Sequence, residues 1–189
     1  MKELSFNLKG QRKYIQGPDI YNAIADFYEN MKLYELSFHQ MMTHNIILCE
    51  NLPNENLYFI AKYKNQIDEK ILFGVKNESS VPLKSIPYPE ENIISKSKID
   101  FSKQEITLFN SSGFSFMEEI ITLNKHLLLN ITNNKKGKWY FAKLMLNDDF
   151  KVLYPLSMRF KMLFNNMLAK SEICINGKIA GAVLFFWQA

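Results

Sequence analysis

The chain has 189 residues, of which 47% are hydrophobic and 14% aromatic, so it carries enough apolar volume for a sizeable core and is not a disordered protein. Its formal net charge of +4 is spread along the chain, without the basic stripe interleaved with aromatics that a nucleic-acid groove needs. Two cysteines that form no C-x-x-C motif and only three histidines argue against a zinc site, and we expect neither a metal nor a cofactor.

Apolar segments in this sequence are short. The longest purely apolar run spans residues 179–187, which is far below the length of a membrane-spanning helix. The first residues, Met1-Lys2-Glu3, do not open an apolar signal-peptide core. We therefore expect a cytoplasmic protein of one domain, 1–189, that contacts neither a membrane nor nucleic acid.

The first helix is predicted to begin at Gly17-Pro18. Proline is pre-shaped for the first helical turn, and Asp19 places an acid where it complements the helix dipole. Apolar residues then recur at helical spacing and form one stripe: Ile20, Ala23, Ile24, Phe27 and Met31. This pattern predicts an amphipathic helix that lies on an apolar surface.

Strands are predicted after this helix. From residue 35 to residue 49 the apolar period changes to two, which predicts one long strand with His44 on the same side as the core residues. Residues 57–64 and 70–75 predict two more strands. The proline-containing stretch 77–96 predicts a linker.

The second half repeats this course. A helix is predicted to start near Ser112-Gly113, where Ser115 and Glu118 have the spacing of a capping box. The pattern then predicts a strand at 139–146 and a three-stranded antiparallel meander over 156–187. Asn165-Asn166 separates the first two strands of the meander, and Asn176-Gly177 is a strong hairpin signal between the last two.

Counterparts in the two halves support an internal duplication. Five residues of the first half pair, at a nearly constant offset, with five of the second: Leu4, Phe6, Gly17, Ile20 and Ile24 with Ile99, Phe101, Gly113, Phe116 and Ile120. We therefore interpret the domain as two pseudo-repeats, about 1–76 and 97–189, joined by the linker 77–96.

A helix entered just after the first strand, followed by an antiparallel meander that can wrap it, resembles the hot-dog fold, and its repetition resembles a double hot dog. The resemblance is carried by residues 14–31 with the strands to residue 75, and by residues 109–128 with the meander to residue 187. It implies an α+β fold with two central helices wrapped by a curved antiparallel sheet. A helix-grip or lipocalin-like cavity is the alternative, although a helix-grip chain usually ends in its long helix.

The resemblance implies an acyl thioester of coenzyme A or acyl carrier protein as ligand, with its acyl chain in an apolar tunnel. The thioester carbonyl would meet backbone N–H groups at a helix N-terminus, where Gly17 and Gly113 allow close approach. Hot-dog dehydratases set a histidine in the loop before the helix, and neither loop here contains one. The departure disfavours dehydration and leaves thioester hydrolysis or acyl transfer.

Three side chains are candidates for the chemistry, each with a structural alternative. Asp19 is a candidate general base or nucleophile, or a surface acid that complements the helix dipole. Glu119 is a candidate acid facing the other half, or part of a solvated helix face. His44 is a candidate proton shuttle, or a hydrogen-bonded core residue.

Three hypotheses for function follow. The first is an acyl-thioester enzyme, a thioesterase or acyltransferase of fatty acid or polyketide metabolism. The second is a non-catalytic module that binds an apolar ligand or a partner protein. The third is a structural subunit that pairs through an exposed apolar patch. The chain is expected to be a monomer or a homodimer.

Overall fold

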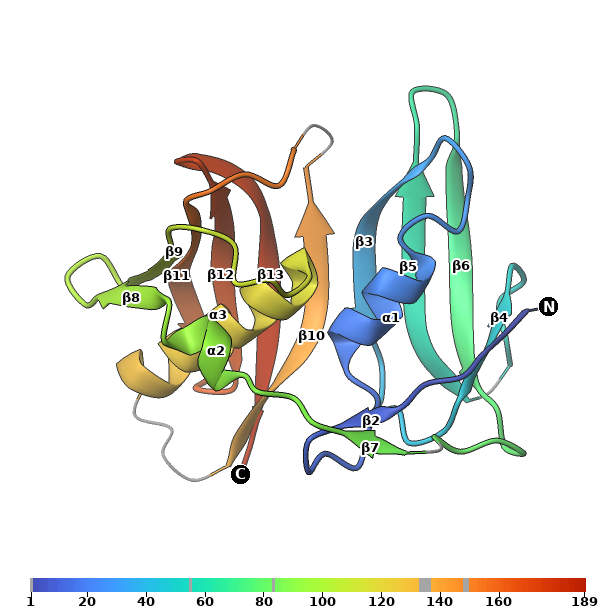
Figure 1. Ribbon diagram of the computed structural model, residues 1–189. Coiled ribbons are helices and arrows are strands. Elements are labelled where there is room, and N and C mark those ends of the chain that lie inside the picture. Colours follow the sequence, from blue (N-terminus) through green and yellow to red (C-terminus); the bar gives the residue numbers. More distant parts are fainter. Residues whose placement is uncertain (1, 55, 83, 133–136, 148–149) are drawn as a thin grey trace. The chain divides into compact units, whose positions relative to one another are not determined.

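The computed structural model describes residues 2–54, 56–82, 84–132, 137–147 and 150–189 (Figure 1). The chain divides into two compact units, Met1–Tyr88 and Pro89–Ala189, which we call the N-terminal and the C-terminal unit. The division falls inside the predicted linker 77–96. That segment contains strand β7 (Ser85–Ile86) and the short helix α2 (Glu91–Ile94), and its residue 83 lies outside the described residues.

The N-terminal unit is built on an antiparallel sheet with the strand order β1-β4-β6-β5-β3. Its strands are β1 (Lys2–Leu4), β3 (Lys32–Phe38), β4 (Ile46–Cys49), β5 (Leu57–Lys64) and β6 (Glu69–Lys76). The short strand β2 (Leu8–Lys9) pairs in parallel with β7. Large side chains on the inner strand β5 are fully buried in this core: Tyr58, Phe59 and Tyr63.

Helix α1 spans Gly17–Ile24, with a proline at its start and Asp19 in its first turn as predicted. It is shorter than the helix that the apolar stripe to Met31 predicted. A fully buried tyrosine of β5 accounts for part of this difference, because the hydroxyl of Tyr63 donates a hydrogen bond of 2.7 Å to the carbonyl oxygen of Ile24. This bond satisfies one of the carbonyls that a helix leaves open at its C-terminus.

The prediction of a single strand over residues 35–49 is wrong for the middle of this segment. Strand β3 ends at Phe38 and β4 begins at Ile46, so His44 lies in the connecting loop. Side chains replace the strand ladder there: the Tyr58 hydroxyl accepts from the N–H groups of Thr43 and His44, both at 3.2 Å. The buried Asn45 binds Ser80 and the N–H of Phe6. Such side-chain bonds compete with regular pairing of the backbone.

The C-terminal unit has a larger antiparallel sheet, with the strand order β10-β13-β12-β11-β9-β8 (Figure 1). Its strands are β8 (Ser97–Asp100), β9 (Glu105–Leu108), β10 (Lys138–Leu146), β11 (Leu156–Phe164), β12 (Leu168–Ile175) and β13 (Lys178–Gln188). The predicted meander is confirmed. Both predicted turns have positive φ, at Asn165-Asn166 and at Asn176-Gly177, where short polar residues and glycine tolerate it.

Helix α3 spans Phe116–Ile131 and packs on the sheet of the C-terminal unit, mainly on β11 and β9. The predicted capping box is confirmed. The Ser115 hydroxyl accepts from the N–H of Glu118, and the Glu118 carboxylate accepts from the N–H of Ser115 at 3.0 Å. The buried face of α3 is apolar for most of its length, with Met117, Ile120, Leu123, Leu127 and Leu128 fully buried.

Two strands of the C-terminal unit approach closely at Gly181. A β-carbon at this position would overlap the carbonyl oxygen of Met145, a main-chain atom of the neighbouring strand β10. Gly181 pairs with Leu146 across the β10–β13 ladder, so the contact lies inside the regular sheet. Glycine is therefore required here for space rather than for a special backbone angle.

Candidate functional site

The N-terminus of α1 brings together two predicted site residues, Gly17 and Asp19. Asp19 Oδ1 lies 2.6 Å from the ammonium nitrogen of Lys9, which comes from strand β2, and both side chains are only 15% exposed. The carboxylate is thus held by a cation in a largely buried setting, where such a pair is screened little by solvent. As a base, Asp19 has to give up or share this contact.

Gln16, the residue before the helix, was not predicted from the sequence. Its backbone is extended and its carbonyl accepts the first helical hydrogen bonds, from the N–H groups of Asp19 and Ile20. Its side chain is 7% exposed, and within the described part of the chain its Nε2 has no hydrogen-bond partner. A buried amide donor without an acceptor is costly unless a ligand or a water uses it.

Gln16 was missed because glutamine is not among the residues preferred at an N-cap, and its side chain forms no capping bond here. The one available signal is its position, directly before the predicted helix start Gly17-Pro18. In the first helical turn the N–H groups of Asp19 and Ile20 donate to the Gln16 carbonyl. Pro18 has no N–H, so the backbone donor of the adjacent residue, Gly17, remains. Together the Gln16 N–H₂ group and this N–H form an environment suited to an oxygen that carries negative charge.

Two more predicted residues, Glu119 and Gly113, lie at the N-terminus of α3. Glu119 is 0% exposed, so the expected solvated face is not its setting. Its Oε1 accepts from the N–H and the hydroxyl of Ser112, and its Oε2 accepts from the hydroxyl of Tyr154, all at 2.7 Å. Burial raises the pKa of Tyr154, and its bond to the Glu119 carboxylate acts in the same direction. These bonds connect the loops that contain Ser112 and Tyr154 to the helix.

Gly113 lies in the loop that Glu119 holds. Its φ is +91°, a conformation that favours glycine, and the space where a β-carbon would stand is open. The N–H of Gly113 donates to the Ser111 hydroxyl at 3.1 Å, and the N–H of Phe114 donates to the Ser112 hydroxyl at 3.3 Å. Both N–H groups already have acceptors, so a ligand carbonyl at this end would have to compete with serine hydroxyls.

His44 lies apart from these helix termini, in the loop before β4. Its Nδ1 is 3.0 Å from the hydroxyl of Thr43, and its backbone N–H donates to Tyr58. Neither partner is an acid, and the side chain is partly exposed. In the structure His44 is therefore a hydrogen-bonded residue of a loop.

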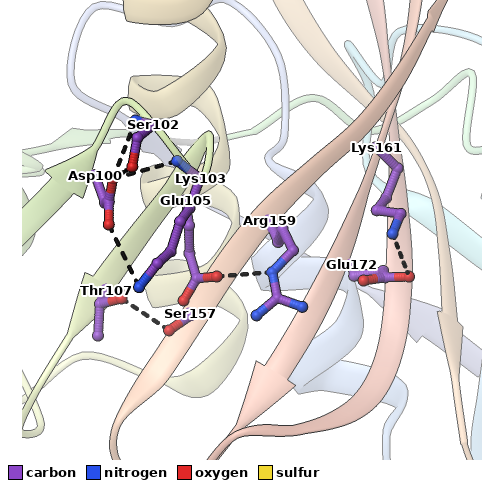
Figure 2. Close-up of polar contacts among 9 residues, drawn as sticks. All are labelled: Asp100, Ser102, Lys103, Glu105, Thr107, Ser157, Arg159, Lys161 and Glu172. Atoms are coloured by element: carbon purple, nitrogen blue, oxygen red, sulfur yellow. Dashed lines mark hydrogen bonds and ion pairs between the residues drawn. The ribbon is translucent and has the colours of Figure 1, made fainter.

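A polar surface on strands β8, β9, β11 and β12 of the C-terminal unit was not predicted either (Figure 2). Figure 2 shows cross-strand contacts between Glu105 and Arg159 at 2.7 Å and between Lys161 and Glu172 at 3.4 Å. The hydrogen bond to the Glu105 carboxylate raises the pKa of Arg159. Opposite charges paired across strands stabilise a sheet surface, which explains this group without a ligand.

Cysteine chemistry and metal binding find no support in the described residues. Burial raises the pKa of Cys174, which keeps it in the unreactive thiol form, and Cys49 is shifted in the same direction for the same reason. Among the described residues, no group of three histidines, cysteines or acids is arranged to hold a metal ion. In the same part of the chain, no helix is both long and apolar enough to cross a membrane.

No protein-family model matches this sequence, and no curated protein does. Solved structures do match. The tesB protein of Mycobacterium avium subspecies paratuberculosis has a TM-score of 0.54 at 8% identity, with 97% of this chain and 91% of that chain covered. The erythromycin dehydratase has a TM-score of 0.44 at 7% identity, with 93% and 82% covered.

The dehydratase domain of the CurF module of curacin polyketide synthase has a TM-score of 0.40 at 7% identity, with 91% of this chain and 81% of that chain covered. At such low sequence identities, structural similarity indicates only a shared fold. Of these three structures, the tesB protein is similar enough to support that conclusion. The match to the tesB protein and the antiparallel strands described above support the prediction made from the order of elements: the chain has a hot-dog fold.

Proposed function

We propose that this chain is a double hot dog, with α1 and α3 as its two central helices, and that it handles acyl thioesters as a thioesterase or acyltransferase. The observation that carries the proposal is the buried, unpartnered Nε2 of Gln16 at the N-terminus of α1. The hot-dog likeness, which extends over 97% of the chain, supports it.

In this proposal the thioester carbonyl oxygen accepts hydrogen bonds from Gln16 Nε2 and from the backbone N–H of Gly17. Both donors are fixed before the reaction, so they stabilise the negative charge that develops on the oxygen when a nucleophile adds to the carbonyl carbon. The positive end of α1 acts in the same direction. Glycine at position 17 lets the carbonyl approach the backbone closely.

Asp19 is the proposed general base. It takes a proton from a water molecule while the water oxygen adds to the carbonyl carbon. The intermediate then collapses, the carbon–sulfur bond breaks, and the proton passes to the thiolate, so that one carboxylic acid and one thiol leave. In the transferase version an acceptor hydroxyl replaces the water. Lys9 holds the Asp19 carboxylate in place until substrate binds.

Glu119 and Gly113 have a supporting role in this scheme. The three hydrogen bonds to Glu119 occupy its carboxylate and fix the loop that carries Gly113, so we assign Glu119 as a positioning residue. A role for His44 in proton transfer stays a prediction, and its bonds to Thr43 and Tyr58 favour a structural one. Coenzyme A or acyl carrier protein is the proposed carrier, for a monomer or homodimer in the cytoplasm.

A second function is a module that binds an apolar ligand without turnover. It is favoured by the engagement of both predicted acids, Asp19 by Lys9 and Glu119 by Ser112 and Tyr154. In this version Gln16 binds a carbonyl or carboxylate oxygen of the ligand without any reaction. The two functions differ in one measurable quantity, the release of thiol.

The proposal is tested with a panel of acyl-CoA and acyl-carrier-protein substrates, by measuring thiol release over the rate in buffer. We expect Gln16→Leu to lower kcat about 10²-fold or more, as loss of an oxyanion donor does. Asp19→Asn should lower it about 10²-fold or more through loss of the base. Glu29→Gln, an exposed acid after α1, is the matched control and should keep wild-type kcat.

The outcomes separate the two functions. Thiol release that is lost in Gln16→Leu and Asp19→Asn but kept in Glu29→Gln supports the enzyme. Binding of acyl-CoA that depends on Gln16, without thiol release, supports the binding module. If no substrate of the panel is bound and none releases thiol, both proposed functions are wrong.

A further inference from the structure

Strand β8 is the last strand in the order of the C-terminal sheet, with β9 as its neighbour (Figure 1). Within the described residues, no main-chain hydrogen bond of residues 97–100 reaches a segment other than β9. The N–H and C=O groups on the outward side of β8 are therefore open. Such a row of groups is a template for pairing with another strand.

The side chains of β8 alternate between the two surfaces of the sheet. Ile99 is opposite Ile106 of β9, which is fully buried on the side that α3 covers. Lys98 and Asp100 therefore point to the other surface, and Figure 2 shows Asp100 among the polar residues there. Lys98 is exposed, and the Asp100 side chain is 44% exposed. A base and an acid thus lie two residues apart on one surface of an open edge.

The turn after β8 holds the Asp100 carboxylate in place. Its Oδ1 accepts from the hydroxyl of Ser102 at 2.7 Å and from the N–H of Lys103 at 3.2 Å. These two hydrogen bonds lower the pKa of Asp100. Its Oδ2 is 3.6 Å from the ammonium nitrogen of Lys103, and an exposed contact of this length contributes little. The carboxylate is therefore ionised, fixed and able to bind a second cation.

A second copy of this chain has few registers in which it can extend the sheet across this edge. Two identical antiparallel strands are related by a two-fold axis through the sheet, so residues of one surface face residues of the same surface. An axis centred on Lys98 sets lysine against lysine, and an axis centred on Asp100 sets acid against acid. An axis centred on Ile99 sets Lys98 opposite Asp100 of the partner subunit, twice in each dimer.

We propose that this chain forms a homodimer in which the β8 strands of two copies pair antiparallel about Ile99. The two ion pairs between Lys98 and Asp100 of the partner subunit favour this register, and like charges disfavour the other two. The open main-chain groups of both edges then bind each other. Phe101, which is 64% exposed directly after β8, lies beside Ser97 of the partner subunit and loses exposure. This pairing is independent of the proposed chemistry at α1.

A lysine on an edge strand also serves in some proteins to keep other strands away. For this chain such a role predicts a monomer at every concentration, and stronger association of Lys98→Ala than of the wild type. The acid two residues further along β8 favours pairing instead. On a two-fold axis it supplies the opposite charge that the lysine lacks on its own strand.

The test measures the mass of the full-length chain by sedimentation equilibrium from about 1 µM to about 1 mM. Because a four-residue edge is a small interface, we expect a weak dimer with a dissociation constant of about 0.1 mM. Lys98→Glu and Asp100→Lys each turn two attractive pairs into two repulsive ones, and each should raise this constant about tenfold or more. Lys178→Glu, at an exposed position at the start of β13, is the matched control and should keep the wild-type constant.

An equimolar mixture of Lys98→Glu and Asp100→Lys is the decisive measurement. In the mixed dimer the acid introduced at position 98 faces the lysine introduced at position 100, and the unchanged lysine and acid face each other. The mixture should therefore associate about as tightly as the wild type, although neither variant does so alone. Asp100→Asn keeps an acceptor for the turn and is the second variant should lysine disturb it. It should raise the constant about threefold or more.

The outcomes decide between the dimer and its alternatives. A wild-type chain that stays monomeric up to about 1 mM overturns the inference, as does a dimer that Lys98→Glu and Asp100→Asn leave unchanged. An equal loss in Lys178→Glu shows an effect of net charge alone and also overturns it. If Asp100→Lys melts like the wild type and its mixture with Lys98→Glu stays monomeric, the register about Ile99 is wrong.

Discussion

At the residue scale, Asp19 and Glu119 show how two acids in the first turn of a helix acquire different roles. Asp19 faces the cation of Lys9, a partner that can move away on a flexible side chain. Glu119 is bound by a backbone N–H and two hydroxyls, in a setting without exposure to solvent. The first arrangement suits a base that must be released, and the second suits an anchor that must not move.

We predict that Glu119→Gln lowers the free energy of unfolding by about 1–3 kcal/mol. The glutamine amide turns an N–H₂ group toward donors that now lack an acceptor. The measurement is urea unfolding of the wild type and the variant. Glu91→Gln, an exposed acid at the start of α2, is the control and should change the free energy of unfolding by less than about 0.5 kcal/mol.

A double-mutant cycle between Glu119→Gln and Tyr154→Phe identifies the contact responsible. If their hydrogen bond of 2.7 Å carries part of the loss, the double variant is less destabilised than the sum of the two single variants. A loss of thiol release in Glu119→Gln with unchanged stability would contradict the anchoring role and support a catalytic one.

The settings of these two acids were not equally predictable from the sequence. The place of Asp19 in a first helical turn follows from its neighbours Gly17 and Pro18, which are local signals. The burial of Glu119 depends on Tyr154, which is 35 residues away along the chain, and no periodicity reports such a contact. Gln16 was missed for a related reason, because an unpaired side chain leaves no pattern in the sequence.

At the scale of elements, the end of the short helix α1 is bonded to a side chain of β5. The hydroxyl of Tyr63 reaches the carbonyl of Ile24 at the end of the helix. Burial raises the pKa of Tyr63 above its ordinary value near 10, and the neighbouring Tyr28 adds to the shift. The neutral phenol is therefore the form that the folded state requires.

From this we predict that Tyr63→Phe costs about 1 kcal/mol of stability at pH 8, the usual loss for one hydrogen bond. Because the folded-state pKa is raised, the contribution of Tyr63 is complete below pH 10 and declines as the pH rises from there toward the folded-state pKa. The gap between wild type and variant should therefore narrow from pH 8 to pH 11 in urea unfolding. A gap of constant size at both pH values would contradict this assignment.

Elements that were predicted correctly are set by short-range chemistry. The capping box of α3 and the turn Asn176-Gly177 each involve neighbouring residues and follow directly from residue type. The break between β3 and β4 was not predictable in this way. It depends on Asn45 and Tyr58, whose partners come from distant segments and override an alternating pattern that continues through the loop.

At the scale of the whole molecule, the chain has two compact units, and each contains antiparallel strands and at least one helix. Our proposal from the sequence is a single domain of two pseudo-repeats, which requires that the units unfold together. The two tryptophans, Trp139 and Trp187, both belong to the C-terminal unit, so their fluorescence reports on that unit alone. Far-ultraviolet circular dichroism reports on both units.

We predict that the urea transitions followed by tryptophan fluorescence and by circular dichroism coincide in midpoint and slope. Coincidence of probes is the signature of one cooperative unit, as expected when two repeats form a single domain. Two separated midpoints, or a dichroism signal that persists after the fluorescence change is complete, would instead show two independent domains.

The close approach at Gly181 has a consequence for engineering and for divergence of this sequence. The obstacle to a side chain is the main chain of Met145, and no exchange of a neighbouring side chain can remove it. Repacking libraries for this meander should therefore hold the codon at position 181 constant, whichever apolar residues they sample around it. At this one place in β13 the limit on substitution is the spacing of two backbones and not the packing of side chains.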